Sequence, residues 1–188
     1  MSSQLEPLPL ELKKEILAWC REILAAKLNK KDIPPPPKDL GDRQGGVFVT
    51  LKKEQRLRGC IGRFVFDDLL ETAISEMVLA AAFKDYRFTP LKKSELPDLD
   101  ITVSILSPPE PLKSLADLVI GRDGLYLIHP KGRGVLLPVV AADYGFSPEE
   151  FARQTSIKAG LSPDAYKDPE AKLMVFTAPA FSTDPSEN

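Results

Sequence analysis

The chain has 188 residues, of which 43% are hydrophobic and 28% charged, and its formal net charge is −2. This length and composition are those of one globular domain, with or without a small appended lobe, and they argue against a disordered or fibrous chain. The nearly balanced charge gives the molecule as a whole no attraction to nucleic acid or to an anionic membrane.

Cysteine usage and hydropathy favour a soluble cytoplasmic protein. The two cysteines, Cys20 and Cys60, do not make a disulfide framework. The first residues lack the basic region and apolar core of a signal peptide. The longest nearly apolar stretches, 77–83 and 135–142, are far shorter than the roughly 20 residues that a membrane-spanning helix needs. We therefore expect a cytoplasmic location and no membrane segment.

The first predicted element is an amphipathic helix over 10–28. Its apolar residues recur at three- and four-residue spacing, and Cys20 lies on that apolar stripe, where a small buried side chain is expected. The stretch 33–46, rich in proline and glycine, predicts a connector. Two short β-prone runs, 46–51 and 57–62, then enclose the charged residues KKEQR and predict an antiparallel hairpin.

The middle of the chain predicts a helix followed by a strand. Asp68 and Glu71 have the spacing of a capping box and predict a helix over 67–85. The alanines within this helix indicate close approach of another backbone. In 98–106 apolar and polar residues alternate, which predicts a strand with one face in the core.

The last part of the chain predicts a second hairpin, a helix and a strand. After a short helix in SLADLVIGRDG, the runs GLYLIH and VLLPVV flank the basic turn PKGRG. Ser147 as cap, Pro148 and Glu150 mark the start of a helix over 147–160, and a strand follows over 172–181. Strands in hairpins with helices outside them predict an α+β fold, an antiparallel sheet with flanking helices.

The segment RLRGCIGRF, residues 56–64, concentrates the candidate chemistry. On a regular strand Arg58 and Cys60 share one face, and a nearby positive charge stabilises a thiolate. Gly59 and Gly62 leave room for another backbone or a substrate. The structural alternative is that Cys60 packs under a helix while Arg58 forms a buried ion pair, with Asp85 as a candidate partner. Arg58 is the more informative residue, because an unpaired arginine is costly to bury.

A second candidate block, FKDYRFTPL, follows the helix that ends near residue 85. Asp85 and Arg87 either tie down this loop or line a cleft beside the Cys60 strand. Basic residues between aromatic ones also suggest RNA stacking, but the pI of about 5.6 and the lack of a ribonucleoprotein motif argue against nucleic acid.

Other catalytic patterns are weak. His129 is the only histidine, and it has no metal-ligand spacing with Cys20, Cys60 or the carboxylates, so no metal site is expected. A Cys60–His129 pair is geometrically open, although a plain strand-end histidine is favoured. No G-x-S-x-G motif is present, and the glycine stretches match neither a Walker motif nor a dinucleotide fingerprint.

The hexapeptide LRGCIG at 57–62, with the ordered blocks GVFVTL, DYRFTPL, VSIL, LLPVV and KAGL, resembles the AMMECR domain family. The resemblance covers about residues 10–178 and implies a single α+β domain with a larger sheet-and-helix lobe and a smaller subdomain. From the polar residues at the end of the chain we expect a flexible tail over 179–188. The resemblance also implies a cytoplasmic or nuclear setting. It implies no agreed activity and no known cofactor, but related domains occur beside Memo-like and radical SAM proteins, which are therefore candidate partners.

By position, the family motif falls on six consecutive residues and a second block: Leu57, Arg58, Gly59, Cys60, Ile61, Gly62, and then Asp85, Arg87 and Phe88. Two positions depart from the family pattern. Arg63 stands where many members carry a small hydroxyl residue, and Ser156 stands where a cysteine is often found. The second departure argues against a mechanism that uses two cysteines.

Three functional hypotheses follow. The first is a ligand- or partner-binding domain with a cleft around Arg58, Gly59, Cys60, Gly62, Arg63, Asp85 and Arg87 that receives an anionic small molecule or peptide. The second is a thiol enzyme with Cys60 as its catalytic nucleophile and Arg58 as its activator. The third is an RNA-associated factor.

Overall fold

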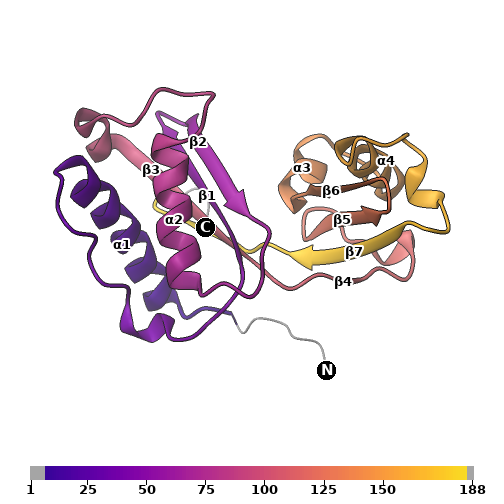
Figure 1. Cartoon of the computed structure of the whole chain (residues 1–188), viewed down its shortest axis with the longest axis horizontal. Helices are drawn as coiled ribbons and strands as arrows, with labels where there is room; N and C mark the ends of the chain where they lie inside the picture. Colours follow the sequence, from indigo (N-terminus) through magenta and orange to yellow (C-terminus); the bar gives the residue numbers. More distant parts are fainter. Residues whose placement is uncertain (1–6, 186–188) are drawn as a thin grey trace. The chain divides into compact units, whose positions relative to one another are not determined.

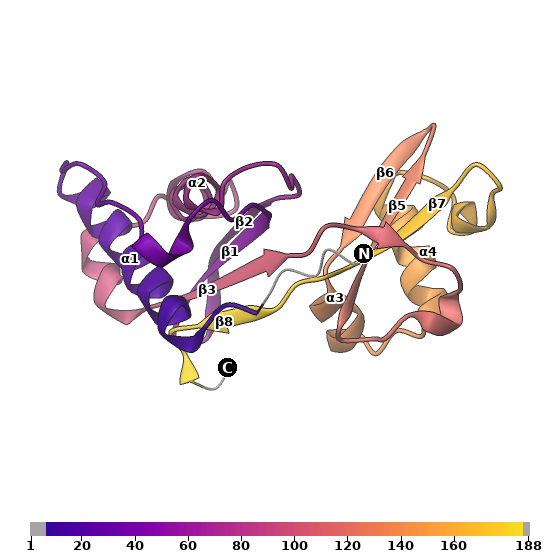
Figure 2. The same cartoon turned by 90° about the horizontal axis from the view of Figure 1, so that it is seen from below.

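The computed structural model describes residues 7–185 of the chain, which form two compact units (Figures 1 and 2). Unit 1 contains residues 7–106 and 180–185, and unit 2 contains Ser107–Pro179. Each unit is built on its own antiparallel four-stranded sheet with helices beside it. The predicted α+β class with an antiparallel sheet and flanking helices is therefore confirmed.

Unit 1 is a sheet with helices on one face. Its elements are α1 (Leu10–Leu28), η1 (Lys38–Leu40), β1 (Gly46–Lys53), β2 (Arg56–Arg63), α2 (Leu70–Phe83), η2 (Lys93–Asp98), β3 (Leu99–Leu106) and β8 (Ala180–Ser182). The strand order is β2-β1-β3-β8, so β2 and β8 are edge strands. In both views α1 and α2 lie on the same side of the sheet, and among the described residues of unit 1 no helix covers the other side (Figures 1 and 2).

The core of unit 1 lies between its sheet and its two helices. The apolar stripe of α1, including Cys20, is buried as predicted, and the alternation of β3 puts Ile101 and Val103 in the same core. The predicted hairpin is also present: β1 pairs with β2 around Glu54 and Gln55, which both adopt positive φ. Two such residues make the tight turn that suits the twist of a hairpin.

Unit 2 has the second sheet, with strand order β4-β7-β5-β6. Its elements are β4 (Glu110–Pro111), η3 (Leu115–Asp117), β5 (Asp123–His129), β6 (Gly132–Leu136), α3 (Pro138–Asp143), α4 (Pro148–Lys158), η4 (Ala165–Lys167) and β7 (Lys172–Thr177). Its core gathers around Leu125, Phe151 and Ala152. The predicted start of α4 is confirmed, because the hydroxyl of Ser147 accepts a hydrogen bond from the amide of Glu150.

Several sequence predictions were wrong in detail. The α2 helix starts at Leu70 without a side-chain cap, since Asp68 is bound by Arg63 instead. The strand expected over 135–140 ends at Leu136, and α3 starts at Pro138. The strand expected over 172–181 is split into β7 and β8, which belong to different sheets. Because Ala180–Ser182 form β8, the predicted flexible tail does not begin at 179; residues 186–188 lie outside the described part of the chain.

The helix predicted within SLADLVIGRDG is only the short η3, at Leu115–Asp117. Within residues 7–185, no helix combines the length and the apolar character that crossing a membrane requires.

Candidate functional site

The LRGCIG segment forms most of β2, and its two glycines are explained by packing. A Cβ at Gly59 would lie 2.1 Å from the carbonyl oxygen of Ala81 in α2, so only glycine allows the helix to approach this closely. At Gly62 a Cβ would lie 2.1 Å from the ring of Phe48 on the neighbouring strand. The backbone that the alanines of α2 were expected to approach is therefore β2 itself.

Arg58 is held by a carboxylate, but the sequence suggested the wrong partner. Its guanidinium donates to both carboxylate oxygens of Glu95, at 2.8 and 3.1 Å, and the two side chains are 13% and 15% exposed. This bidentate pairing with Arg58 lowers the pKa of Glu95 to about 2. Arg58 thus forms the ion pair foreseen in the structural alternative, with Glu95 in place of Asp85.

A bulge explains why simple alternation misplaced Arg58. Leu51 pairs with Gly59 but the next residue, Lys52, pairs with Leu57, so Arg58 has no partner in the register. One extra residue in a strand breaks the alternation of faces at that point. The prediction that Arg58 lies beside Cys60 on a regular strand therefore loses its basis.

Asp85 and Arg87 bind the outer edge of β2 at Cys60. The carboxylate of Asp85, 2% exposed, accepts from the Cys60 amide at 2.9 Å and from Nε and Nη2 of Arg87 at 2.9 and 2.7 Å. Nη2 of Arg87 also donates to the carbonyl of Cys60 at 3.2 Å. These contacts, with Arg87 as the main cause, hold the pKa of Asp85 well below its ordinary value. Both backbone polar groups of Cys60 are bound, which protects this position of an edge strand from pairing with another strand.

The side chain of Cys60 lies on the helix-free face of the sheet. Gly59 faces α2, and Val49 and Leu51 of β1 are buried in the core, so their neighbours Cys60 and Thr50 face the other way. The hydroxyl of Thr50 donates to the sulfur of Cys60 at 3.2 Å. Cys60 is half-buried.

This arrangement continues across all four strands. Cys60 pairs with Thr50, Thr50 with Thr102, and Thr102 with Ser182, and the hydroxyl of Thr102 donates to that of Ser182 at 2.9 Å. We call these four residues the thiol–hydroxyl row. Phe48 flanks it on one side and Lys52 and Leu57 on the other, as the strand register requires.

The remaining predicted arginine, Arg63, is also paired. It donates to Asp68 at 2.6 Å and contacts Glu76 on α2. The three arginines of the expected cleft therefore meet four carboxylates, those of Glu95, Asp68, Glu76 and Asp85. Arg87 has the most exposed side chain of the three, at 44%.

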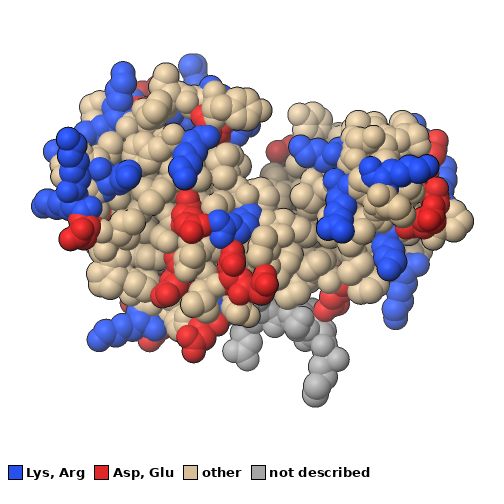
Figure 3. Space-filling model, viewed as in Figure 1, with Lys and Arg blue, Asp and Glu red and all other residues tan. Residues whose placement is uncertain are grey.

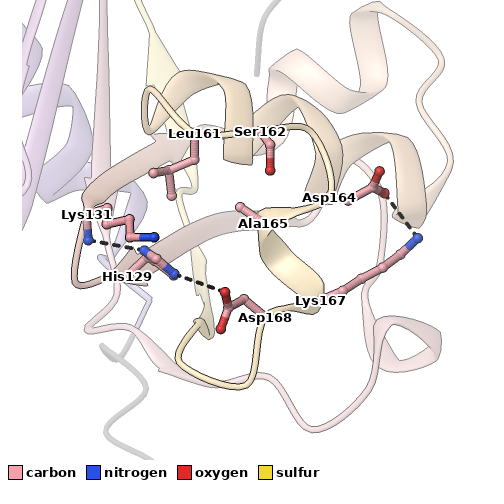
Figure 4. A pocket seen from close by; sticks show the side chains of 8 residues that line it. All are labelled: His129, Lys131, Leu161, Ser162, Asp164, Ala165, Lys167 and Asp168. Carbon is pink, nitrogen blue, oxygen red and sulfur yellow. Dashed lines mark hydrogen bonds and ion pairs between the residues drawn. The ribbon is translucent and has the colours of Figure 1, made fainter.

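Other candidate residues belong to other elements of the fold. Cys20 is fully buried, and that burial raises the pKa of its thiol to about 12. Ser156, which stands where a cysteine was considered, is buried and donates to the carbonyl of Ala152 within α4. His129 ends β5 in unit 2, beside a cavity of about 430 Å³ whose walls include Lys131, Lys167 and Asp168 (Figure 4).

Two residues of the candidate site could not be identified, or were overlooked, from the sequence. Glu95 lies in a stretch without periodicity, 37 residues from Arg58, and no local pattern marks it. Thr50 does carry a signal, because the alternation of β1 places it opposite the core residues Val49 and Leu51. The pairing of Thr50 with Cys60 itself depends on the bulge at Arg58, which alternation does not predict.

Known proteins match this chain over most of its length. The family model described as AMMECR1 matches residues 17–181. A protein from Methanothermobacter thermautotrophicus is 46% identical over 162 residues, covering 79% of this chain and 82% of the relative, and one from Aquifex aeolicus is 40% identical over 156 residues, covering 79% and 80%. The crystal structure of the uncharacterised protein PH0010 from Pyrococcus horikoshii matches with a TM-score of 0.80 and 32% identity, covering 95% of both chains.

Proposed function

The chain belongs to the AMMECR1 family, and from its own geometry we propose that it is a binding protein whose recognition surface is the thiol–hydroxyl row with Arg87 at its rim. The row is the observation that carries the proposal. It places the thiol of Cys60 and the hydroxyls of Thr50 and Thr102, all half-buried, in line on a sheet face that the helices of unit 1 leave uncovered (Figure 2), while Ser182 ends the row as a buried residue.

The walls of the row favour a ligand with mixed character. Binding sites combine apolar surfaces with a few placed polar groups. Here the ring of Phe48 lies over Gly62 on one side, and Leu57, 43% exposed, lies on the other. The hydroxyls of Thr50 and Thr102 and the thiol of Cys60 supply hydrogen-bonding groups between these apolar walls.

Arg87 supports an anionic group on the ligand. Arg58 and Arg63 are paired with carboxylates and have less exposed side chains, so of the three arginines of the expected cleft only Arg87 is left beside Cys60. Arg87 uses Nε and Nη2 for Asp85, and its exposed guanidinium leaves Nη1 to donate outward. The proposed ligand is an anionic small molecule or an acidic peptide segment, including one presented by a Memo-like or radical SAM protein.

A second function, thiol catalysis by Cys60, is favoured by one observation, the hydrogen bond from the Thr50 hydroxyl to the sulfur. Hydrogen bonding to sulfur is one way in which proteins activate a cysteine. Its weakness is that unit 1 supplies no histidine as a base, since the single histidine of the chain belongs to unit 2.

RNA association has less support. In Figure 3, lysine and arginine side chains gather at the end of unit 1 where α1 and α2 terminate. Helix carboxyl ends favour basic residues because of the helix dipole, and Lys93 there donates to Asn29 rather than standing free. The helix dipole accounts for Lys27 in the last turn of α1, whereas α2 has no basic residue in its last turn.

The binding proposal is tested by NMR titration of the full chain with inorganic phosphate and, separately, with an acetylated aspartate tripeptide. We expect shift changes confined to Thr50, Cys60 and residues 85–88, and at least tenfold weaker binding in Arg87→Gln. Arg153→Gln is the matched control, because Arg153 is similarly exposed and also paired with carboxylates. Unchanged affinity in Arg87→Gln, or shifts that map to unit 2 alone, would overturn the proposal.

Alkylation by iodoacetamide tests the thiol alternative in the same protein. Cys20 is an internal control, since its burial keeps it unreactive in the folded state. If Cys60 reacts no faster than a model thiol at pH 7, catalysis by Cys60 is excluded while the binding proposal stands.

A further inference from the structure

The further inference concerns the corner of unit 2 where β5 ends and β7 begins. These strands pair antiparallel, with Ile128 opposite Lys172, so the end of one lies beside the start of the other. His129 is the last residue of β5, and Asp168 and Glu170 lie in the segment that leads from η4 into β7. The sheet therefore brings together one imidazole and two carboxylates that are about 40 residues apart in sequence.

The His129 ring carries an unsatisfied polar atom. Its side chain is 4% exposed, and Nδ1 accepts a hydrogen bond from the Lys131 amide at 3.1 Å. Nε2 is buried and makes no hydrogen bond within residues 7–185; the carboxylate of Asp168 lies 3.5 Å away as a loose ion-pair contact. A buried nitrogen without a partner is costly in an ordinary structural role.

The carboxylates of Asp168 and Glu170 both lie near that nitrogen. Oδ1 of Asp168 accepts from the Glu170 amide at 2.9 Å, which turns Oδ2 toward Nε2 of His129 at 3.5 Å (Figure 4). The Glu170 amide is also the main cause that lowers the pKa of Asp168. One ligand atom from each of the three residues lies within 4.8 Å of the others.

We propose that His129 Nε2, Asp168 Oδ2 and a carboxylate oxygen of Glu170 bind a divalent cation of the zinc class. Bonds of about 2.0–2.2 Å to such a cation bring its ligands to roughly 3.5 Å from one another. Asp168 is 40% exposed and Glu170 is exposed, so small side-chain movements can close the set around the buried nitrogen. Three protein ligands leave a coordination position open to the cavity of Figure 4, as in zinc sites that hold water.

Cation binding has a defined consequence for the His129 ring. With the Lys131 amide donating to Nδ1, a neutral ring carries its proton on Nε2. A cation needs the Nε2 lone pair, so the proton must move to Nδ1 and the Lys131 amide must turn away. Lys131 lies in the turn that joins β5 to β6, so the rearrangement would fall in this turn. The same change provides a signature that non-specific binding to acidic side chains would lack.

The test is a titration of the EDTA-treated full chain with Zn²⁺, followed by calorimetry and by ¹⁵N NMR of the imidazole. Because the chain has a single histidine, its ring signals need no assignment. We expect one equivalent of Zn²⁺, displacement of the Nε2 resonance, a shift of the Lys131 amide, and at least tenfold weaker binding in both Asp168→Asn and Glu170→Gln.

Asp164→Asn is the matched control, because Asp164 lines the same cavity but is paired with Lys167 and Arg153. An unchanged histidine spectrum would overturn the proposal, and so would binding through Cys60 alone. Equal weakening in Asp164→Asn and Asp168→Asn would also overturn it, since that result describes general attraction to acidic residues.

Discussion

In both units, glycines in an edge strand allow a helix to pack closely against that strand. The units differ in whether the polar groups beside the strand are hydrogen-bonded. In unit 1 the edge strand β2 contacts α2 through Gly59, and in unit 2 the edge strand β6 contacts α4 through Gly132 and Gly134. Missing side chains let a helix backbone reach the strand in both cases. Glycines in such strands are therefore explained first by close packing against a helix, and only then by a function.

The difference lies in hydrogen-bond satisfaction. At β2 the buried carboxylate of Asp85 has four donors, from Cys60 and Arg87, and the edge is closed. Beside β6, Nε2 of His129 makes no hydrogen bond within residues 7–185 and has only the carboxylate of Asp168 at 3.5 Å. A satisfied network fixes a surface in one geometry, whereas an unsatisfied buried atom indicates that a further group is needed. The first region therefore fits recognition by a rigid surface, and the second fits ligation.

The largest loss of stability is expected from adding a methyl group to a strand glycine that contacts a helix. In Gly59→Ala the new methyl group would meet the Ala81 carbonyl, and in Gly134→Ala it would meet the Thr155 carbonyl at 2.5 Å. Because neither obstacle is a flexible side chain, we expect each variant to lose about 3 kcal/mol of unfolding free energy. Urea denaturation measures it. Gly45→Ala is the control, since a Cβ there would meet a leucine methyl at 3.3 Å as its nearest neighbour. Equal losses of stability in all three variants would contradict the explanation by close contact between strand and helix.

Opening the closed edge of β2 should cost slightly less. In Asp85→Asn the charge that binds Arg87 is lost and the amide offers a single acceptor oxygen to the donors of Cys60 and Arg87. We expect a loss of about 2–3 kcal/mol, because breaking a buried ion pair is costly and Arg87 recovers part of its solvation. Denaturation of Asp164→Asn, an exposed and paired aspartate, gives the baseline. A loss no greater than that baseline would show that the edge is not held by this network.

The sequence predicted those parts of the molecule that depend on local pattern. The α1 helix at 10–28, the first hairpin and the alternation of β3 all follow from spacing within about 20 residues. The Arg58–Glu95 pair and the split between β7 and β8 depend on contacts between distant segments. The bulge at Arg58 breaks the face rule that was applied to Cys60. His129 was judged only by linear ligand spacing, which cannot reveal carboxylates that a sheet brings close.

The Arg58–Glu95 pair predicts a pH dependence of stability. Since the pKa of Glu95 is lowered to about 2 in the folded protein, its ionised pair stabilises the fold above about pH 4.5, and this contribution disappears as the pH falls toward 2. Glu95→Gln should lose about 2 kcal/mol at pH 7, with a smaller difference from wild type at pH 3. Urea denaturation at both pH values measures it, with the exposed Glu22→Gln as control. A difference that stays constant between pH 7 and pH 3 would argue against the ionised pair as its source.

The smallest loss of stability is expected at the amino-terminal ends of α4 and α2, the helices that pack beside these edge strands. In α4 the hydroxyl of Ser147 binds the amide of Glu150, so Ser147→Ala should cost about 1 kcal/mol. In α2 the residue that the sequence suggested as a cap, Asp68, instead binds Arg63, and both side chains are about one-third exposed. Asp68→Ala should therefore cost about 0.5 kcal/mol or less, because Arg63 keeps its contact with Glu76. Urea denaturation of the two variants under one set of conditions decides the matter: a loss near 1 kcal/mol in Asp68→Ala would restore Asp68 as the cap of α2, and a negligible loss in Ser147→Ala would remove the contrast between the two helices.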